Sequence, residues 1–256
     1  MRQNGAGGQD TVVSCALSDL PTACEGGVGR GPAGDSIVIA ETVLIPDPAG
    51  ALYWPEEHAL VVADLHLEKG SSYAARGVLL PPYDTAATLA RLAQLIDRYA
   101  PRLVIALGDN FHDNDGPVRL APADRAALEV LQRGRDWLWI AGNHDPAPAC
   151  RVGGDFAAML ALGPLLFRHE PSSDEAPGEI AGHLHPTARV AVRGRSIGRR
   201  CFAADQHRMV MPAFGAYAGG LNVRHRAFAG LFDQTFVAHL LGERRTYAFA
   251  GIDCLL

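Results

Sequence analysis

Residues 58–66 read His-Ala-Leu-Val-Val-Ala-Asp-Leu-His, a short apolar run followed at once by polar residues. A run of this length is typical of a strand that is buried on both faces of a parallel sheet. Two later segments repeat the pattern: Arg102–Leu107 leads into Gly-Asp-Asn, and Trp137–Ala141 leads into Gly-Asn-His-Asp. The three segments predict buried strands that each present polar side chains where they end.

Helical patterns occur between and after these strands. Apolar residues recur at spacings of three and four from Leu89 to Tyr99, which predicts an amphipathic helix. A second helix is predicted over Ala123–Arg133, because Pro122 precedes it and Gly134 follows it. A third helical stretch is expected over Asp155–Leu162.

The remaining regular structure is predicted to be strand. Antiparallel strands are expected over Ser36–Leu44 and Ala51–Trp54. Further strands are expected in the second half, over Leu165–Arg168, Glu179–Ala181, Ala188–Val192, Arg199–Ala204, Met209–Pro212 and Tyr247–Cys254. Strand–helix–strand units followed mainly by strands indicate an α/β fold in which two sheets pack together and are flanked by helices.

The composition indicates a globular chain with a separate N-terminal tail. The 256 residues are 48% hydrophobic and 20% charged, which suits one domain or at most two. Residues 1–35 are rich in glycine and small polar residues and have no sustained period. We therefore expect a flexible tail over 1–35 and a single domain over 36–256.

The charge and the cysteines exclude some classes of protein. The formal net charge of −5 gives no overall positive field, so any contact with nucleic acid needs a local basic patch. The five cysteines are scattered, which argues against a disulfide framework. No run approaches the roughly 18 apolar residues that cross a membrane. We expect a reduced, cytoplasmic protein that does not associate with membranes.

The polar clusters that follow the predicted strands form one candidate site, because the carboxyl ends of strands in open α/β sheets bring their loops together. They supply carboxylates, one amide and several imidazoles but no thiolate, a mixed set that suits Mn²⁺, Fe²⁺ or Zn²⁺. The candidate ligands are Asp64, His66, Asp109, Asn143, His169, His183 and His185. Seven ligands are too many for one tetrahedral ion and fit two divalent ions that share a bridging ligand. Two such ions can polarise a phosphoryl group and generate a hydroxide.

The order Asp-x-His, Gly-Asp, Gly-Asn-His-Asp, a lone His and Gly-His-x-His resembles the calcineurin-like metallophosphoesterase superfamily. The resemblance implies a metallophosphoesterase-type sandwich of two mixed β-sheets and hydrolysis of phosphoric esters by a hydroxide that bridges two metal ions. It implies that one ion is held by Asp64, His66 and His185, that the other is held by Asn143, His169 and His183, and that Asp109 bridges them.

Three more residues receive roles from this resemblance. It implies that His144 contacts the leaving-group or phosphate oxygen and acts as a general acid, where charge develops opposite the attacking hydroxide. It implies that Asp145 orients His144. His112, in Gly-Asp-Asn-Phe-His-Asp, is a candidate substrate contact or a neighbour of the ligands.

Residues 186–223 carry a narrower resemblance, through Pro-Thr-Ala-Arg-Val-Ala-Val-Arg-Gly-Arg and Met-Pro-Ala-Phe-Gly-Ala-Tyr-Ala-Gly-Gly-Leu-Asn-Val. They are similar to a bacterial subgroup, the ligase-associated DNA damage response endonucleases. That similarity implies Mn²⁺-dependent cleavage of phosphodiesters, with a DNA ligase, a helicase and an exonuclease as repair partners. Arg189, Arg193 and Arg195 are candidate contacts to a DNA backbone. The alternative is a solvated hairpin edge, where charge prevents sheet-to-sheet association.

Three classes of function are therefore open. The first is a dinuclear metal phosphodiesterase that acts on DNA or on a nucleotide diester. The second is a phosphomonoesterase or nucleotidase, since the same metal core supports either reaction. The third is a non-catalytic scaffold, which the complete ligand set disfavours because unused metal ligands are electrostatically costly to bury together.

Overall fold

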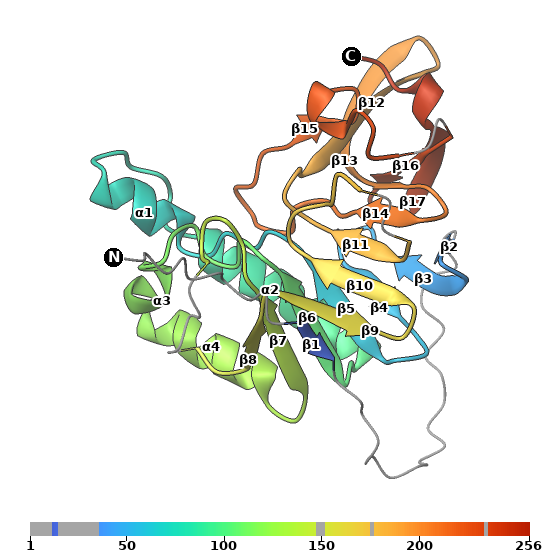
Figure 1. Cartoon of the computed structure of the whole chain (residues 1–256). Coiled ribbons are helices and arrows are strands. Elements are labelled where there is room, and N and C mark those ends of the chain that lie inside the picture. The colour runs from blue at the N-terminus through green and yellow to red at the C-terminus, as the bar shows by residue number, and fades with distance from the viewer. Residues whose placement is uncertain (1–11, 15–35, 147–151, 175–176, 233–234) are drawn as a thin grey trace, which may run out of the picture.

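Two mixed β-sheets form the body of the molecule in the computed structural model, which describes residues 12–14, 36–146, 152–174, 177–232 and 235–256 (Figure 1). The first sheet follows chain order: β2 (Ile37–Ile39), β3 (Thr42–Pro46), β4 (Leu52–Trp54), β5 (Ala59–Val62), β6 (Leu103–Leu107), β7 (Asp136–Ile140) and β8 (Asp155–Ala157). Pairing is antiparallel from β2 to β5 and parallel from β5 to β8. The parallel half therefore ends its strands at a common edge.

The second sheet combines distant parts of the chain. Its main order is β1 (Val12–Ser14), β9 (Met159–Leu162), β10 (Leu165–Arg168), β11 (Glu179–Ala181), β14 (Arg208–Val210), β13 (Arg195–Ala204), β12 (Pro186–Val192) and β15 (Leu221–Asn222). In addition, β16 (Val237–Leu241) pairs with the last residues of β13, and β17 (Thr246–Ala250) pairs with β16. Short 3-10 helices span Arg226–Phe228 and Gly251–Asp253.

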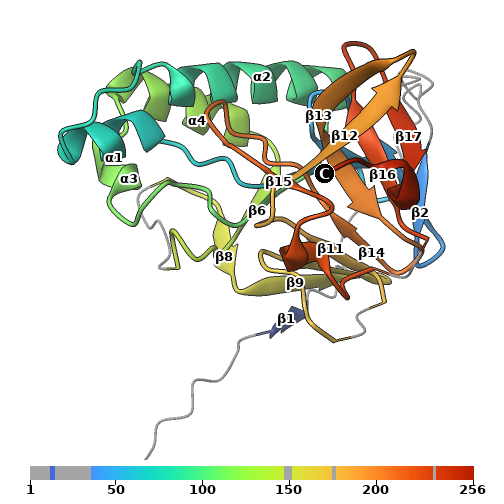
Figure 2. The ribbon, with the colours of Figure 1, turned by 90° about the horizontal axis from the view of Figure 1, so that it is seen from above.

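Strand β5 shows why both faces of the central sheet are apolar. Ala59 and Val61 belong to the core between the sheets, which includes Trp54 and Phe167. The alternate residues of β5 belong to a second core beneath the helices α2 (Asp84–Tyr99) and α4 (Pro122–Gln132). Figure 2 shows these helices together on one side of the molecule. The expected α/β sandwich of two mixed sheets with flanking helices is confirmed.

The prediction of a helix over Asp155–Leu162 is wrong, because the structure has strands β8 and β9 in this segment. Leu160 and Leu162 are buried and Ala161 between them is not, which is the period of a strand. Alanine, methionine and leucine favour a helix by under about 1 kcal/mol each. Pairing of β8 with β7 and of β9 with β10 outweighs that preference.

Other predicted boundaries also change. Ser36–Leu44 is a hairpin of β2 and β3 rather than one strand, with its turn at Ala40 and Glu41, whose φ angles are 45° and 65°. The final predicted strand, Tyr247–Cys254, ends at Ala250. Within residues 1–35, which the sequence predicts to be a flexible tail, Val12–Ser14 forms β1 and pairs with β9; residues 1–11 and 15–35 lie outside the described residues, so the tail stays a prediction.

Two short helices were not predicted: α1 (Lys69–Ala75) and α3 (Gly116–Arg119). Figure 1 shows α1 extending from the body of the molecule near α3. None of the helices in the described ranges combines the length and apolar character needed to span a membrane.

Replacing Phe167 with alanine is expected to lower the free energy of unfolding by about 3–5 kcal/mol. Phe167 is fully buried between the sheets and lies 6.3 Å from Trp54, ring centroid to ring centroid, so truncation leaves a cavity. Chemical denaturation monitored by tryptophan fluorescence measures the change. The exposed Val118, replaced with alanine, is the control and should change stability by under about 0.5 kcal/mol. Equal effects of the two variants would contradict this packing.

Candidate metal centre

The candidate ligands all follow the carboxyl ends of strands, as the sequence predicted. The parallel strands β5, β6 and β7 lead into the first four, and the parallel strands β10 and β11 of the other sheet lead into the last three. In chain order these residues are Asp64, His66, Asp109, Asn143, His169, His183 and His185. The site therefore lies where the carboxyl ends of the two sheets meet.

One group of ligand atoms is formed by Asp64, His66 and His185, which lie within 4.8 Å of one another. The Nε2 atom of His185 is 3.3 Å from Oδ1 of Asp64 and 3.3 Å from Nε2 of His66. Asp64 and His66 are buried and His185 is partly exposed. The three side chains thus converge on a single point near the surface.

A second group surrounds the ring of His169. Its Nε2 atom lies 3.3 Å from Oδ1 of Asp109, 2.9 Å from Oδ1 of Asn143 and 3.2 Å from Nδ1 of His183. The other ring nitrogen, Nδ1, donates a hydrogen bond to the carbonyl oxygen of Leu107 at 3.1 Å. This bond fixes the tautomer and leaves the lone pair of Nε2 directed into the group.

Asp109 lies between the two groups. Its Oδ1 atom faces His169, and its Oδ2 atom is 3.8 Å from Nε2 of His66. The carboxylate is 2% exposed and accepts a hydrogen bond from the backbone N–H of His144 at 2.9 Å. Each oxygen is therefore directed at a different group, which is the arrangement a bridging carboxylate needs.

The donor set fits divalent cations. Burial, reinforced by the neighbouring His185, lowers the pKa of His66 to about 2, and burial also lowers the pKa of His183. Both rings are therefore neutral near pH 7 and have a lone pair available. The Nε2 atoms of His66 and His185 lie 3.3 Å apart, and a cation bound by both would stabilise this close approach of two lone pairs. Carboxylate, amide and imidazole ligands suit a first-row divalent metal.

Glycines in the motifs create the space for these ligands. A Cβ atom on Gly142 would lie 2.4 Å from Oδ1 of Asp109, and one on Gly182 would lie 2.7 Å from Oδ2 of Asp64. Gly108 has a φ of +71°, and its Cβ would be 2.4 Å from the ring of His169. Each glycine precedes one ligand in the chain and makes room for another.

The backbone is unusual at the same positions. Positive φ angles, between 43° and 67°, occur at five candidate ligands: Asp64, His66, Asp109, His183 and His185. This left-handed conformation is unfavourable for residues other than glycine, and such residues cluster at functional sites because the surrounding structure holds them there. The positive φ angles therefore mark the turns that follow the strands as the places where the candidate ligands are held.

The structure places His144 at the centre but gives it a different orienting partner. Its Nδ1 atom donates to the carbonyl oxygen of His112 at 2.9 Å, and its Nε2 atom is 3.9 Å from Oδ2 of Asp109. Asp145, expected to orient His144, instead accepts hydrogen bonds from the backbone N–H groups of Asn110 and Phe111. Burial raises the pKa of Asp145 to about 6. Asp145 therefore secures the loop that carries Asp109.

His112 belongs to this side of the site. It forms a third group of ring nitrogens with His66 and His144, all within 4.8 Å. Its ring centroid is 5.0 Å from that of His144. Burial, together with the positive charge of Lys69, lowers the pKa of His112 to about 4.

Sequence reasoning missed the contribution of α1. Lys69, the only lysine of the chain, donates to the carbonyl oxygen of Tyr217 at 3.1 Å and lies close enough to influence His66 and His112. Tyr73, one turn along α1, has its ring centroid 5.5 Å from that of His112. The single lysine beside Asp-x-His was the available signal, but its interpretation needed the position of α1.

The three candidate arginines are separated by the hairpin that carries them. Strand β12 begins directly after His185, so Arg189 is four residues from a candidate ligand. Arg193 and Arg195 lie at the turn between β12 and β13. At about 3.3 Å per residue, Arg193 is about 26 Å along the strand from His185. Only Arg189 is near the metal centre.

Comparison with known families agrees with this geometry. The profile of the calcineurin-like phosphoesterase family matches residues 58–192, which is more than half of the chain. The chain belongs to this family. It is therefore a metal-dependent phosphoester hydrolase, and the expected superfamily is confirmed.

Among solved structures, the nuclease MPE of Pseudomonas putida is similar over 84% of this chain and 100% of its own, with 28% identity and a TM-score of 0.63. The phosphoesterase YfcE of E. coli is similar over 75% and 98%, with 14% identity and a TM-score of 0.38. A comparison with curated proteins finds no significant match.

Replacing Gly142 with alanine is expected to abolish hydrolysis and reduce bound metal. The added Cβ would lie 2.0 Å from the backbone nitrogen of Asp109 and would displace that carboxylate. Elemental analysis and hydrolysis of bis-p-nitrophenyl phosphate measure the two effects. Gly198→Ala is the control, because a Cβ there meets no atom within 4 Å. Full metal content in Gly142→Ala would show that Asp109 does not depend on this space.

Proposed function

We propose that the protein is a dinuclear, Mn²⁺-dependent phosphodiesterase that cleaves DNA. The observation that carries the proposal is the Asp109 carboxylate, whose two oxygens face separate groups of metal ligands. The similarity to a nuclease along the full length of that nuclease supports a nucleic-acid substrate. A role in DNA repair beside a ligase, a helicase and an exonuclease belongs to the same proposal and rests on the resemblance of residues 186–223.

In this proposal the residues of the site have different roles. When bound, the two ions supply an activated water and neutralise charge on the phosphoryl oxygens. His144 delivers a proton from Nε2 to the leaving oxygen, since its Nδ1 atom is committed to the carbonyl oxygen of His112. Asp145 holds the backbone after Asp109, which keeps the bridging carboxylate in place. Asp64, His66 and His185 would hold one ion, and Asn143, His169 and His183 would hold the other.

Exhaustive chelation is expected to abolish hydrolysis, and Mn²⁺ is expected to restore it better than Fe²⁺ or Zn²⁺. The ligands are carboxylate, amide and imidazole groups, a set that suits a labile octahedral ion. Rates are measured after readdition of each metal, with bis-p-nitrophenyl phosphate, p-nitrophenyl phosphate and an oligonucleotide as substrates.

The substrates in this experiment distinguish the two enzyme classes. Faster hydrolysis of the diester and cleavage of the oligonucleotide support the proposal. Faster hydrolysis of the monoester without cleavage of the oligonucleotide would instead identify a phosphomonoesterase or nucleotidase. Full turnover by protein with no measurable metal would contradict the whole mechanism.

Asp109→Asn is expected to lower metal content and rate together, whereas His144→Ala should keep its metal and lose about 10²–10⁴-fold in kcat. The reason is that Asp109 lies between both groups of ligands, while His144 faces the site from one side and is 39% exposed in its side chain. Metal content and single-turnover rates are measured on the same preparations. Equal loss of metal in both variants would refute this division of roles.

A further inference from the structure

A polar pocket of about 410 Å³ opens beside the metal centre, at the start of the β12–β13 hairpin. Thr187 and Arg189 of β12 line it together with Gly198 and Arg200 of β13. Asn222 of β15 closes one side. No acidic side chain is among its lining residues.

The register of the hairpin places both guanidinium groups on one face. Thr187 pairs with Arg200, and Arg189 pairs with Gly198. Directly paired residues, and residues two apart along a strand, share a face of the sheet. Because Gly198 has no side chain and a Cβ there meets nothing within 4 Å, the space between the two arginines is open.

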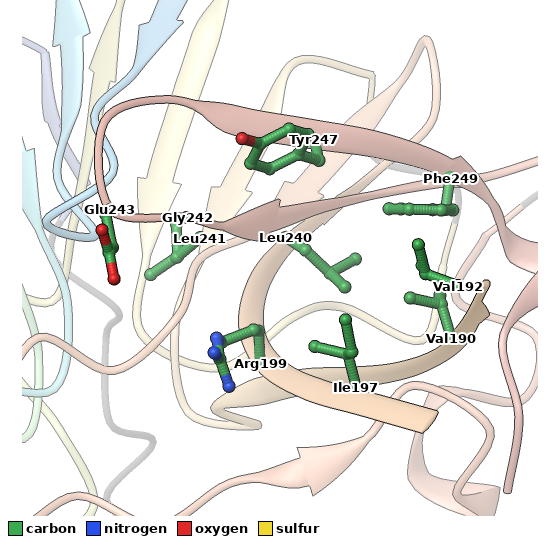
Figure 3. Close-up of a pocket in the computed structure, with 10 residues that line it drawn as sticks. All are labelled: Val190, Val192, Ile197, Arg199, Leu240, Leu241, Gly242, Glu243, Tyr247 and Phe249. Carbon is green, nitrogen blue, oxygen red and sulfur yellow. The ribbon is translucent and has the colours of Figure 1, made fainter. Parts of the chain in front are cut away.

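The opposite face of the same hairpin has a different character. Val190, Val192 and Ile197 line an apolar cavity with Leu240 and Phe249, and Figure 3 shows the side chain of Arg199 at one end of that cavity. Arg199 also borders the polar pocket, but it pairs with Ala188 and alternates with Gly198 and Arg200, so its side chain lies on the apolar face. The positive charge of the polar pocket therefore comes from Arg189 and Arg200.

These charges lack carboxylate partners among the described residues. The guanidinium of Arg189 makes no hydrogen bond or ion pair with any residue that the structure describes. Arg200 donates to the carbonyl oxygen of Ala213 at 2.7 Å, and the half-buried Arg91 of α2 donates to the carbonyl oxygen of Phe214. Burial and the nearby charge of Arg200 lower the pKa of Arg91 to about 10. Cations that are satisfied only by carbonyl groups leave a positive potential that favours an anion.

The pocket borders the segment that carries the last candidate ligand, because Gly220 in its lining lies against the backbone of His185. Thr187 is two residues beyond His185, and the backbone N–H of Leu221 donates to the carbonyl oxygen of His185 at 3.1 Å. Arg189 is about 13 Å along the strand from His185 at about 3.3 Å per residue. A duplex strand carries a phosphate about every 3.4 Å of its axis, so a strand cleaved at the metal centre can reach Arg189 within about four nucleotides.

We propose that this pocket binds a phosphodiester group of the substrate strand a few nucleotides from the group that is cleaved. The inference rests on the proposed function, because it requires a nucleic-acid substrate, and it extends that function by assigning a binding site for the strand. Arg189 and Arg200 contact the phosphate oxygens, and Gly198 leaves the space that the phosphate enters. A small model diester does not extend into the pocket.

Two variants test the pocket from opposite directions. Arg189→Ala removes a positive charge, and Gly198→Asp introduces a negative charge into space that meets no other atom within 4 Å. Arg195→Ala is the matched control, since it removes the same charge as Arg189→Ala at the exposed turn of the same hairpin. Binding of a labelled oligonucleotide is measured by fluorescence anisotropy over a series of salt concentrations, and bis-p-nitrophenyl phosphate hydrolysis is measured in parallel.

Arg189→Ala is expected to weaken oligonucleotide binding about tenfold, the usual scale of a lost hydrogen bond to a charged group. Gly198→Asp is expected to weaken it about as much, because its carboxylate repels the phosphate. Arg189→Ala should also reduce the slope of log K against log[salt] by about 0.7–0.9. Arg195→Ala should change binding less than about twofold, and all three variants should hydrolyse the small diester at the wild-type rate.

Equal weakening by Arg189→Ala and Arg195→Ala would show that only net charge matters and would overturn the pocket. Unchanged binding in Arg189→Ala and Gly198→Asp would overturn it as well. Competition by a free mononucleotide as strong as that by the oligonucleotide would assign the pocket to a small ligand and overturn the role in strand binding. If the wild-type protein binds the oligonucleotide through this pocket but cleaves only the small diester, the proposed DNA cleavage fails and the inference is overturned with it, whereas cleavage of the oligonucleotide that does not depend on the pocket overturns the inference alone.

Discussion

The buried carboxylate of Asp109 is the group on which the metal centre depends. It is almost inaccessible to water, and its two oxygens face His169, which follows β10 of the second sheet, and His66, which follows β5 of the first sheet. A buried carboxylate needs compensating partners. The backbone N–H of His144 supplies one hydrogen bond, and two divalent ions would supply the charge. Gathering these ligands is costly without cations, which is why their convergence indicates metal binding.

The same gathering explains the local backbone. Asp64 and His66 stand two residues apart, as do His183 and His185, and all four have positive φ angles, which are unfavourable for residues other than glycine. Gly142 and Gly182 then allow the loops to approach closely enough for the ligands to meet. Candidate ligands with positive φ angles and glycines without side chains therefore occur together at this site.

The hairpin after the last ligand separates two kinds of surface. One face carries Arg189 and Arg200 beside the open Gly198, and the other lines an apolar cavity with Val190 and Ile197. A strand period of two creates this division from an alternating sequence. A protein with a net charge of −5 thereby presents a local positive pocket next to a centre that binds cations and, in the proposed function, a polyanion.

The sequence alone determined the sandwich and the candidate ligands, because each ligand follows a buried strand and the ends of parallel strands meet at one edge. Tertiary structure decided what depends on partners distant in the chain. His144 is oriented by the carbonyl oxygen of His112, 32 residues away, and Lys69 reaches Tyr217, 148 residues away. The strands over Asp155–Leu162 arise from pairing with β7 and β10, which outweighs a local preference for helix. Local patterns carry no record of such pairings, since they are fixed only when the two sheets assemble.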